Sequence, residues 1–199
     1  MLKILLIDDH AIIRNALKII IRDIHSEVSF HEASELVKVY EEVQKNKFDL
    51  IILDMNLGQN YFYEILRGIH KIDFSARVLV FTMNDAVIFA RHVLRQGANG
   101  FLNKNASESA INDAIRTLLS GGIYIPKETE NEKENPFRDL SDKEFEIFIL
   151  LVKEFSLSKI AGMLSISVST VATYQSRIFE KLKIESKHQL AQLSLRYNL

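Results

Sequence analysis

Short apolar runs alternate with longer segments of helical periodicity over residues 1–120. Runs such as Ile51–Leu53 and Val78–Val80 contain no polar residue, as expected of parallel strands that are covered on both faces. The pattern predicts five strands, at Lys3–Ile7, Glu27–His31, Asp49–Leu53, Arg77–Phe81 and Gly100–Leu102. It predicts helices at about residues 10–23, 34–46, 60–70, 85–95 and 106–119. Five β–α units of this length predict a doubly wound, five-stranded parallel sheet with helices on both faces.

A polar segment, residues 126–137, separates this region from the rest of the chain. It holds both prolines of the protein and four glutamates, and no residue between the prolines is apolar. Such a segment cannot bury enough surface to fold alone, so it predicts a solvated linker. The expected domains are therefore residues 1–125 and residues 138–199.

Residues 138–199 show helical periodicity and no strand pattern. Ser141 and Glu144 have the spacing of a capping box at the start of an apolar-periodic segment. Three further serines have the position of helix N-caps: Ser156, Ser167 and Ser186, the last with Gln189 at the capping-box position. The sequence predicts a small all-α domain of four helices.

Polar residues that can carry chemistry follow four of the five predicted strands. Asp8 and Asp9 follow the first strand, Asp54 the third, Thr82 the fourth and Lys104 the fifth. Ligands bind at the carboxyl edge of a doubly wound sheet, where these strands end. Taken singly, each residue is typical of a turn, a helix cap or a solvated charge. As a set they predict a site.

The side chains of this set suit magnesium and phosphate chemistry. Clustered carboxylate oxygens without a cysteine favour Mg²⁺, which takes a few carboxylates and keeps water. A carboxylate beside Mg²⁺ can attack phosphorus and form an acyl phosphate. Lys104 and Thr82 can then neutralise and hydrogen-bond the phosphoryl oxygens. His10, directly after the acid pair, has two interpretations: it tunes the site, or it is a partly exposed residue at a helix start.

A second candidate surface lies on the helix predicted after Ser167. Its apolar stripe consists of residues at helical spacing: Val171, Tyr174, Ile178 and Leu182. The opposite face carries small or polar residues: Ser169, Ala172, Thr173, Ser176, Arg177 and Glu180. This pattern is typical of a helix that enters the major groove of DNA, and also of a solvated helix face.

Composition and charge limit the other possibilities. Hydrophobic residues make up 47% of the chain and charged residues 26%, which excludes a disordered protein. No apolar run approaches the roughly 18 residues that span a bilayer, so no membrane partner is expected. The acids at positions 8 and 9 exclude a secretory signal, and the absence of cysteine excludes a thiolate zinc site; we expect a cytoplasmic protein. The net charge is −1, yet residues 165–199 carry five basic and two acidic residues, an excess that suits phosphate binding.

Four segments hold the clustered residues at defined spacing: Ile7–His10, Ile52–Asn56, Phe81–Met83 and Gly97–Lys104. In these segments, and over residues 1–122, the chain resembles the receiver domain of two-component response regulators, which has a flavodoxin-like fold. The resemblance implies that Asp54 accepts a phosphoryl group from a sensor histidine kinase, and that Lys104 and Thr82 contact that group. It implies that Mg²⁺ is held by Asp8, Asp9, Asp54 and the backbone carbonyl of Asn56. It also implies that Thr82 and Phe101 form a switch pair that repacks one face of the domain.

Residues 138–199 resemble the helix-turn-helix output domain of the LuxR type, through the motif of residues 161–171 and the segments Leu140–Glu146 and Ile178–Ile184. The two domains in this order are similar to response regulators of the NarL/FixJ type. The resemblance implies binding of double-stranded DNA by a homodimer that forms on phosphorylation. The predicted DNA contacts are Ser169, Thr170, Ala172, Thr173, Ser176, Arg177 and Lys181. We expect Thr173 and Ser176 at base edges, and Thr170, Arg177 and Lys181 at phosphate or guanine.

The sequence leaves three functions to compare. The first is a transcription factor controlled by phosphorylation of Asp54, with no enzymatic activity beyond Mg²⁺-dependent self-phosphorylation and dephosphorylation at that residue. The second is a phosphohydrolase with Asp54 as nucleophile, but Asn56 stands where such an enzyme needs a second acid. The third is a phospho-switched protein-interaction module with weak or no DNA binding. Ala172 favours this third function, because lysine is frequent at its position in LuxR-type domains.

Overall fold

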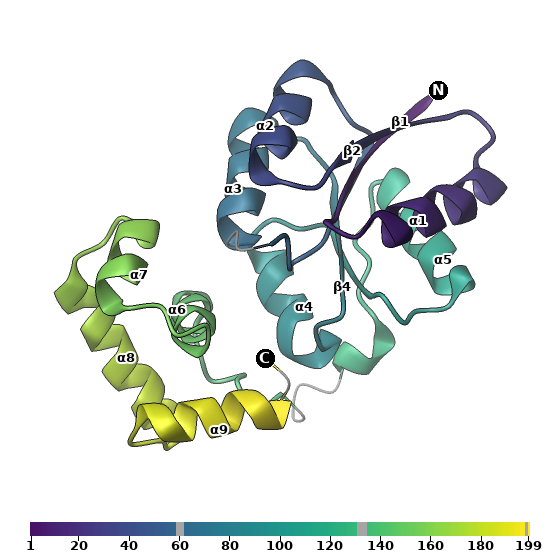
Figure 1. Cartoon of the computed structure of the whole chain (residues 1–199). Coiled ribbons are helices and arrows are strands. Elements are labelled where there is room, and N and C mark those ends of the chain that lie inside the picture. The colour runs from purple at the N-terminus through teal and green to yellow at the C-terminus, as the bar shows by residue number, and fades with distance from the viewer. Residues whose placement is uncertain (59–61, 131–134, 198) are drawn as a thin grey trace. The chain divides into compact units, whose positions relative to one another are not determined.

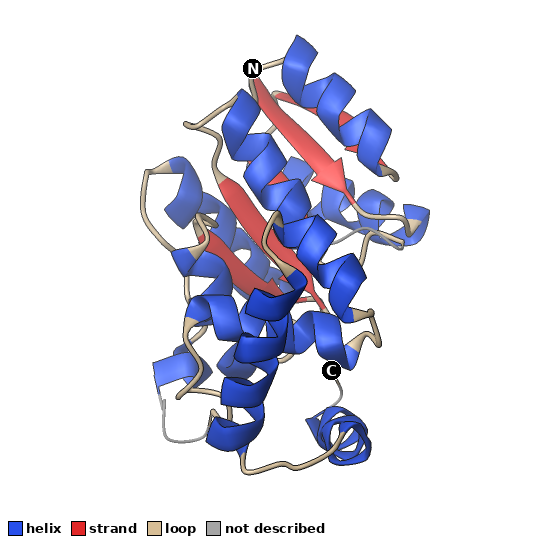
Figure 2. Ribbon diagram, turned by 90° about the vertical axis from the view of Figure 1, so that its left-hand side faces the viewer, coloured by secondary structure: helices blue, strands red, loops and turns tan. Residues whose placement is uncertain are grey.

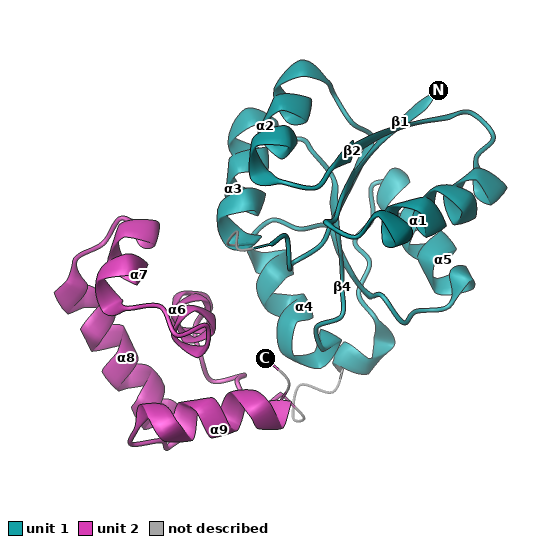
Figure 3. Ribbon diagram, in the orientation of Figure 1, with its two compact units in different colours: residues 1–130 teal, residues 131–199 magenta. Residues whose placement is uncertain are grey.

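The computed structural model of the chain describes residues 1–58, 62–130, 135–197 and 199 (Figure 1). The chain divides into two compact units, Met1–Glu130 and Asn131–Leu199 (Figure 3). In the residues that the structure describes, the first unit contains both strands and helices and the second contains helices alone, as the colours of Figure 2 show.

The first unit is built on five parallel strands in the order β2-β1-β3-β4-β5. The strands are β1 (Leu2–Ile7), β2 (Val28–Ala33), β3 (Leu50–Leu53), β4 (Val78–Thr82) and β5 (Gly100–Asn103). Strand β2 lies on one side of β1, and β3 to β5 follow on the other side. The strand order therefore reverses between β1 and β3, so the point where ligands bind in such sheets lies beyond their carboxyl ends. The predicted doubly wound parallel sheet is confirmed.

Five helices cover the two faces of this sheet: α1 (Ala11–Ile24), α2 (Leu36–Lys45), α3 (Phe62–Ile72), α4 (Ala86–Arg95) and α5 (Glu108–Leu119). Figure 1 shows α1 and α5 on one face and α2, α3 and α4 on the other. Under α1 and α5, one core joins Leu6, Ile52 and Phe81 of the strands to Leu17 and Ile115 of the helices. Strands β3 and β4 are buried along their whole length, which explains why their sequences contain almost no polar residue.

The ends of the strands and helices lie within two residues of the predicted positions. Strand β2 runs further than predicted, because it pairs with β1 as far as Ala33, which lies opposite Ile7. The predicted start of the third helix, residue 60, lies outside the described residues. Sequence periodicity therefore locates each element well and its ends less well.

The second unit has four helices in its described part, as predicted: α6 (Asp142–Val152), α7 (Leu157–Leu164), α8 (Val168–Leu182) and α9 (Lys187–Tyr197). The Ser141 hydroxyl accepts from the backbone N–H of Glu144 while the Glu144 carboxylate accepts from the N–H of Ser141, which confirms the capping box. The hydroxyls of the N-caps Ser156 and Ser167 accept hydrogen bonds in the same way, from the backbone N–H groups of Lys159 and Thr170. No described helix of the chain is both long enough and apolar enough to cross a membrane.

The prediction that residues 126–137 form a solvated linker is wrong at both ends of the segment. Residues Lys127–Glu130 form a short 3-10 helix, η1, in which the buried Thr129 donates its hydroxyl to the carbonyl of Pro126 at 2.7 Å. Phe137 is fully buried, with its ring centroid 4.7 Å from that of Phe148 and 5.3 Å from that of Tyr197. Residues 131–134 lie outside the described part. Phe137 therefore belongs to the core of the second unit, because an aromatic ring at the edge of a polar segment gains more by burial than by exposure.

Replacing Phe137 tests this assignment. We expect Phe137→Ala to destabilise the second unit by about 3–5 kcal/mol, because it removes a buried ring from an aromatic core. Hydrogen exchange read by mass spectrometry should show faster exchange in α6 and α9 and unchanged exchange in β1–β5. The matched control is Phe74→Ala, since Phe74 is 93% exposed and its removal leaves no cavity. Exchange in α6 at the wild-type rate in Phe137→Ala would contradict the assignment.

Candidate phosphoacceptor site and recognition helix

Three charged side chains from three strand ends meet at the carboxyl edge of the sheet. Asp8 follows β1, Asp54 follows β3 and Lys104 follows β5. The Lys104 Nζ lies 2.6 Å from Asp8 Oδ2 and 2.8 Å from Asp54 Oδ2. None of the three side chains is more than 7% exposed, so these ion pairs form in a site largely shielded from water. The convergence predicted for these residues is therefore present.

The Lys104 ammonium compensates charge in this site. Burial disfavours the ammonium ion, but the hydrogen bonds to Asp54 and Asp8 outweigh burial and raise the pKa of Lys104 above its ordinary value. Lys104 is bound to only one oxygen of Asp54. The other, Oδ1, is buried and has no hydrogen-bond partner among the described residues. A buried carboxylate oxygen without a donor is costly, and it is available to a cation or an electrophile.

The residues beside Asp54 complete a donor set for a metal ion. One ligand atom from each of Asp8, Asp9, His10 and Asp54 lies within 4.8 Å of the others. The His10 Nδ1 lies 2.7 Å from Asp9 Oδ1 and 3.1 Å from Asp8 Oδ1, although the His10 side chain is 67% exposed. His10 is thus partly exposed at a helix start and also in contact with the acids. Three carboxylates, one with an unpartnered oxygen, are the kind of ligands that Mg²⁺ prefers.

Thr82 lies at the end of β4 and is fully buried. Its hydroxyl donates to Asn84 Oδ1 at 2.9 Å, and the side-chain amide of the exposed Asn56 donates to the same oxygen at 3.2 Å. The Thr82 hydroxyl is therefore bonded to Asn84 and not to Asp54. Asn84 is not among the residues predicted from the sequence. Its position gave a signal, since it is a polar residue just beyond a strand end, like the other members of the cluster.

Arg14 of α1 is a second residue that sequence analysis missed. Its Nη1 donates to the backbone carbonyl of Asp8 at 2.6 Å, and its Nε donates to Glu32 Oε2 at 2.7 Å. Hydrogen bonding from Lys18 is the main reason that the pKa of Glu32 is lowered, against the effect of burial and with further help from Arg14. Arg14 thus ties the loop after β1 to strand β2. A lone arginine on a helix gives no sequence pattern that predicts this contact.

Phe101 of β5 is fully buried and lies in register with Val80 of β4. Side chains alternate between the faces of a strand, so Thr82 points to the same face as Val80. Paired residues of neighbouring strands share a face, so Phe101 points there as well. The two residues of the predicted switch pair therefore lie on one face of the sheet, opposite the core formed with α1 and α5.

In the second unit, α7 and α8 are joined by the short turn of residues 165–167 and pack against each other. Val171 and Ile178 of α8 are fully buried, which confirms the predicted apolar face. The predicted polar face is exposed at Ser169, Thr170, Thr173, Ser176, Arg177 and Lys181 and half-buried at Ala172. The helix pair therefore has the form of a helix-turn-helix whose second helix carries an exposed polar face.

Lys181 is bound inside the unit. Its Nζ lies 2.6 Å from Glu144 Oε2 and donates to the carbonyl of Asp139 at 3.0 Å. Burial acts to raise the pKa of Glu144, but the hydrogen bonds from Lys181 and Ser141 outweigh burial and lower it. Lys181 thus fastens the end of α8 to the start of α6, a role that its sequence position did not reveal.

Removing the Lys104 charge tests the electrostatics of the strand-end site. Because the pKa of Lys104 is raised, the stabilisation of the folded state by its ammonium group is complete at neutral pH. This stabilisation is lost only as the pH rises above about 10.4. We expect Lys104→Met to lower the free energy of unfolding at pH 7 by about 3 kcal/mol, since two buried carboxylates lose their cation.

The deficit of Lys104→Met should shrink as pH falls to 5. Lowering the pH weakens the repulsion between the two acids that have lost their cation, which restores stability at low pH. Urea denaturation over a pH series measures this difference, with the exposed Lys71→Met as the matched control. A deficit that is constant from pH 5 to pH 8 would contradict the account.

Comparison with known proteins agrees with this geometry. Residues 4–116 match the family of response regulator receiver domains, and residues 138–194 match the luxR family of bacterial regulatory proteins. The oxygen regulatory protein NreC of Staphylococcus carnosus is 30% identical over 215 residues, which cover 100% of this chain and 99% of that protein. The response regulator UvrY of Escherichia coli is 29% identical over 209 residues, which cover 100% of this chain and 96% of that protein.

Solved structures with this fold include RcsB of Salmonella enterica serovar Typhimurium bound to the promoter rprA in the presence of the phosphomimetic BeF3-. The TM-score is 0.79 at 21% identity, over 96% of this chain and 98% of that one, so this likeness concerns the fold. The family matches cover both compact units in the order seen along the chain. The chain therefore belongs to the response regulators of the NarL/FixJ type, in which a receiver domain precedes a LuxR-type helix-turn-helix domain.

Proposed function

We propose that the chain is a DNA-binding transcription regulator whose activity is controlled by phosphorylation of Asp54. The observation that carries this proposal is the state of the Asp54 carboxylate. One of its oxygens is paired with Lys104, and the other is buried with no hydrogen-bond partner in the described part of the chain. A carboxylate held in this way is positioned by Lys104 through one oxygen and has a second oxygen with which to attack phosphorus.

The reaction needs few groups. An Asp54 oxygen forms a bond to the phosphorus of a phosphohistidine on a sensor kinase, the phosphorus–nitrogen bond breaks, and the imidazole leaves with the electron pair. Lys104 neutralises charge on the phosphoryl oxygens. Mg²⁺, for which Asp8, Asp9, Asp54 and the Asn56 backbone carbonyl are the proposed ligands, supplies further positive charge to the same oxygens when it is bound. Later attack by water on the acyl phosphate resets the residue.

The switch that follows rests on Thr82 and Phe101. A phosphoryl group adds about −1.5 to −2 charges at Asp54, next to the end of β4. We expect the Thr82 hydroxyl to exchange its bond with Asn84 for one with a phosphoryl oxygen. The Phe101 ring, which shares the face of Thr82, then turns into the space that Thr82 leaves. This local change repacks the α4–β5–α5 side of the receiver. The added charge at Asp54 thereby shifts the equilibrium between two packing arrangements of this side.

DNA binding is assigned to the outer face of α8. Small residues there allow close approach of the helix to base edges, and Arg177 supplies a cation. NreC and UvrY carry names of regulators, and the RcsB structure holds promoter DNA, which supports the same role for this chain. A phosphorylated homodimer on paired half-sites, in the cytoplasm, is the form that we propose to be active.

A protein-interaction module remains the alternative, because one observation favours it. Of the two cations of α8, Lys181 is paired with Glu144, whereas Arg177 has no carboxylate partner among the described residues. The response to salt separates the two functions. A DNA binder loses affinity as salt rises, with a log–log slope of about −0.9 for each phosphate contact.

The proposed control predicts a coupling between the two units. We expect the full chain to select a paired site from random duplex DNA, and to bind it at least about tenfold more tightly with Mg²⁺ and beryllium fluoride, a typical size of allosteric coupling. Fluorescence anisotropy over a salt series measures both affinity and slope. In Asp54→Asn the tightening should be absent while basal binding remains. Equal affinity with and without the phosphoryl mimic in the wild type would refute the control by Asp54.

A further inference from the structure

The side chains on the first turns of α8 limit how this helix can recognise bases. In a helix-turn-helix, the N-terminal residues of the second helix contact the base edges. From Val168 to Ser176 the exposed side chains of α8 include no charged group and no amide. Direct readout of cytosine uses a carboxylate, and readout of adenine uses an amide. On these turns the exposed polar side chains are the hydroxyls of serine and threonine, which can bond to several bases and do not single out one of them.

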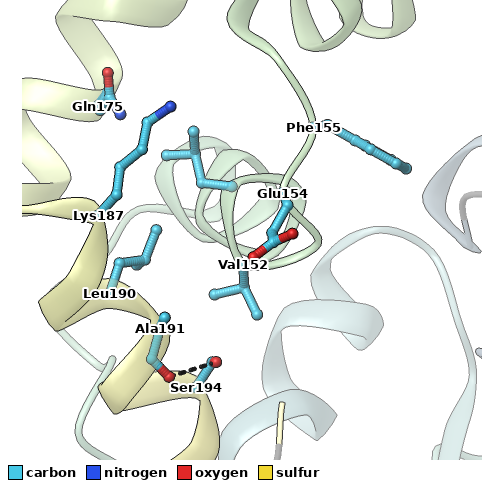
Figure 4. A pocket seen from close by; sticks show the side chains of 9 residues that line it. Val152, Glu154, Phe155, Gln175, Lys187, Leu190, Ala191 and Ser194 are labelled. Atoms are coloured by element: carbon cyan, nitrogen blue, oxygen red, sulfur yellow. Dashed lines mark hydrogen bonds between the residues drawn. The ribbon is translucent and has the colours of Figure 1, made fainter.

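The one amide of α8 is directed elsewhere. Gln175 lines a cavity of about 250 Å³ within the second unit, together with Leu151, Phe155, Lys187 and Leu190. Figure 4 shows Gln175 on α8 on one side of this cavity, with Lys187 and Leu190 of α9 beside it. Gln175 thus faces α6 and α9 and not the outer face of α8. The carboxylate of Glu180 lies beyond Arg177, toward the carboxyl end of the helix.

The hydroxyl groups of the outer face are already bonded to the helix itself. The Thr173 hydroxyl donates to the Ser169 carbonyl at 3.0 Å, and the Ser176 hydroxyl donates to the Ala172 carbonyl at 3.1 Å. The Thr170 hydroxyl lies 2.7 Å from the Ser167 hydroxyl. With the Thr173 hydroxyl turned back to the backbone, its methyl group is the part of the side chain that points away from it.

The apolar groups on the part of α8 that would meet the bases are methyl groups that lie beside these hydroxyls. By helical spacing, Thr173 lies near the centre of the exposed face with Ser169 and Ser176, and the half-buried Ala172 and the 46% exposed Val168 lie toward one edge. On the other side, Thr170, Thr173 and Arg177 line a shallow hollow of about 310 Å³. In the major groove, the only apolar group that a base presents is the C5-methyl of thymine.

We propose that α8 selects its DNA site through thymine C5-methyl groups, which contact the Thr173 methyl and its neighbours Ala172 and Val168. Arg177, at the end of this surface, supplies the contact to guanine or phosphate. The inference rests on the proposed DNA binding and adds the base class that the chain recognises. It predicts half-sites rich in thymine at the positions that α8 covers.

Uracil in place of thymine tests the inference, because it removes the C5-methyl and keeps every hydrogen bond of the base pair. The probe is a duplex recovered by the full chain from a random pool, synthesised with deoxyuridine at one thymine at a time. We expect affinity to fall about fourfold at each contacted thymine, the worth of one buried methyl group. Thymines outside the α8 contact should show no change.

Thr173→Ser is the matched variant, since it removes the methyl and retains the hydroxyl on an exposed helix position. Circular dichroism should show the wild-type fold. We expect Thr173→Ser to bind the thymine duplex about fourfold more weakly than the wild type, as for one lost methyl. At one thymine position the variant should bind the thymine and uracil duplexes equally, because the methyl pair is then already broken.

The outcomes separate the two levels of the proposal. If the full chain recovers no duplex from the pool, both the proposed function and this inference fail. If it recovers a duplex but uracil costs nothing at any position, or the recovered sites lack thymine, the inference alone fails. If uracil is costly to the wild type and equally costly to Thr173→Ser, the methyl readout does not involve Thr173 and the inference fails in its assignment.

Discussion

The ammonium group of Lys104 holds two buried carboxylates, those of Asp8 and Asp54, at the carboxyl edge of the sheet. Without this cation the two acids would repel each other in a site shielded from water. With it, one oxygen of Asp54 is neutralised, and the other has no hydrogen-bond partner among the residues that the structure describes. The sheet supplies the geometry, because β1, β3 and β5 are parallel and deliver all three residues to one edge. Arg14 adds a hydrogen bond to the carbonyl of Asp8, which joins the loop after β1 to helix α1.

The same physical device occurs in the second unit with a different outcome. Lys181 binds a buried carboxylate, Glu144, which the capping box already holds at the start of α6. Here the pair joins two helices and takes a cation away from the outer face of α8. The exposed face of α8 is uncharged in its first turns, where it carries hydroxyl and methyl groups. Charged side chains thus cluster at the proposed phosphorylation site around Asp54. The first turns of α8, which are proposed to contact bases, carry none on their exposed face.

Much of the fold could be predicted from the sequence, because strands buried on both faces and helices with one apolar stripe leave clear periodic patterns. The convergence of Asp8, Asp54 and Lys104 could also be predicted, since parallel topology alone brings strand ends together. The hydrogen-bond partners of individual side chains could not be predicted. Nothing in the sequence couples Lys181 to Glu144, and nothing marks Arg14 as a donor to the Asp8 carbonyl, because these contacts depend on how elements pack. The burial of Phe137 could not be predicted either, because Phe137 ends a polar segment whose composition predicted a solvated linker.

The Asp54 carboxylate is the proposed phosphoacceptor, and mass spectrometry of the full chain after incubation with Mg²⁺ and acetyl phosphate can detect its phosphorylation. We expect a gain of one phosphoryl group, located on the peptide that contains Asp54, absent in Asp54→Asn and absent when Mg²⁺ is chelated. An unchanged mass in the wild type, or a phosphoryl group that persists in Asp54→Asn, would contradict it.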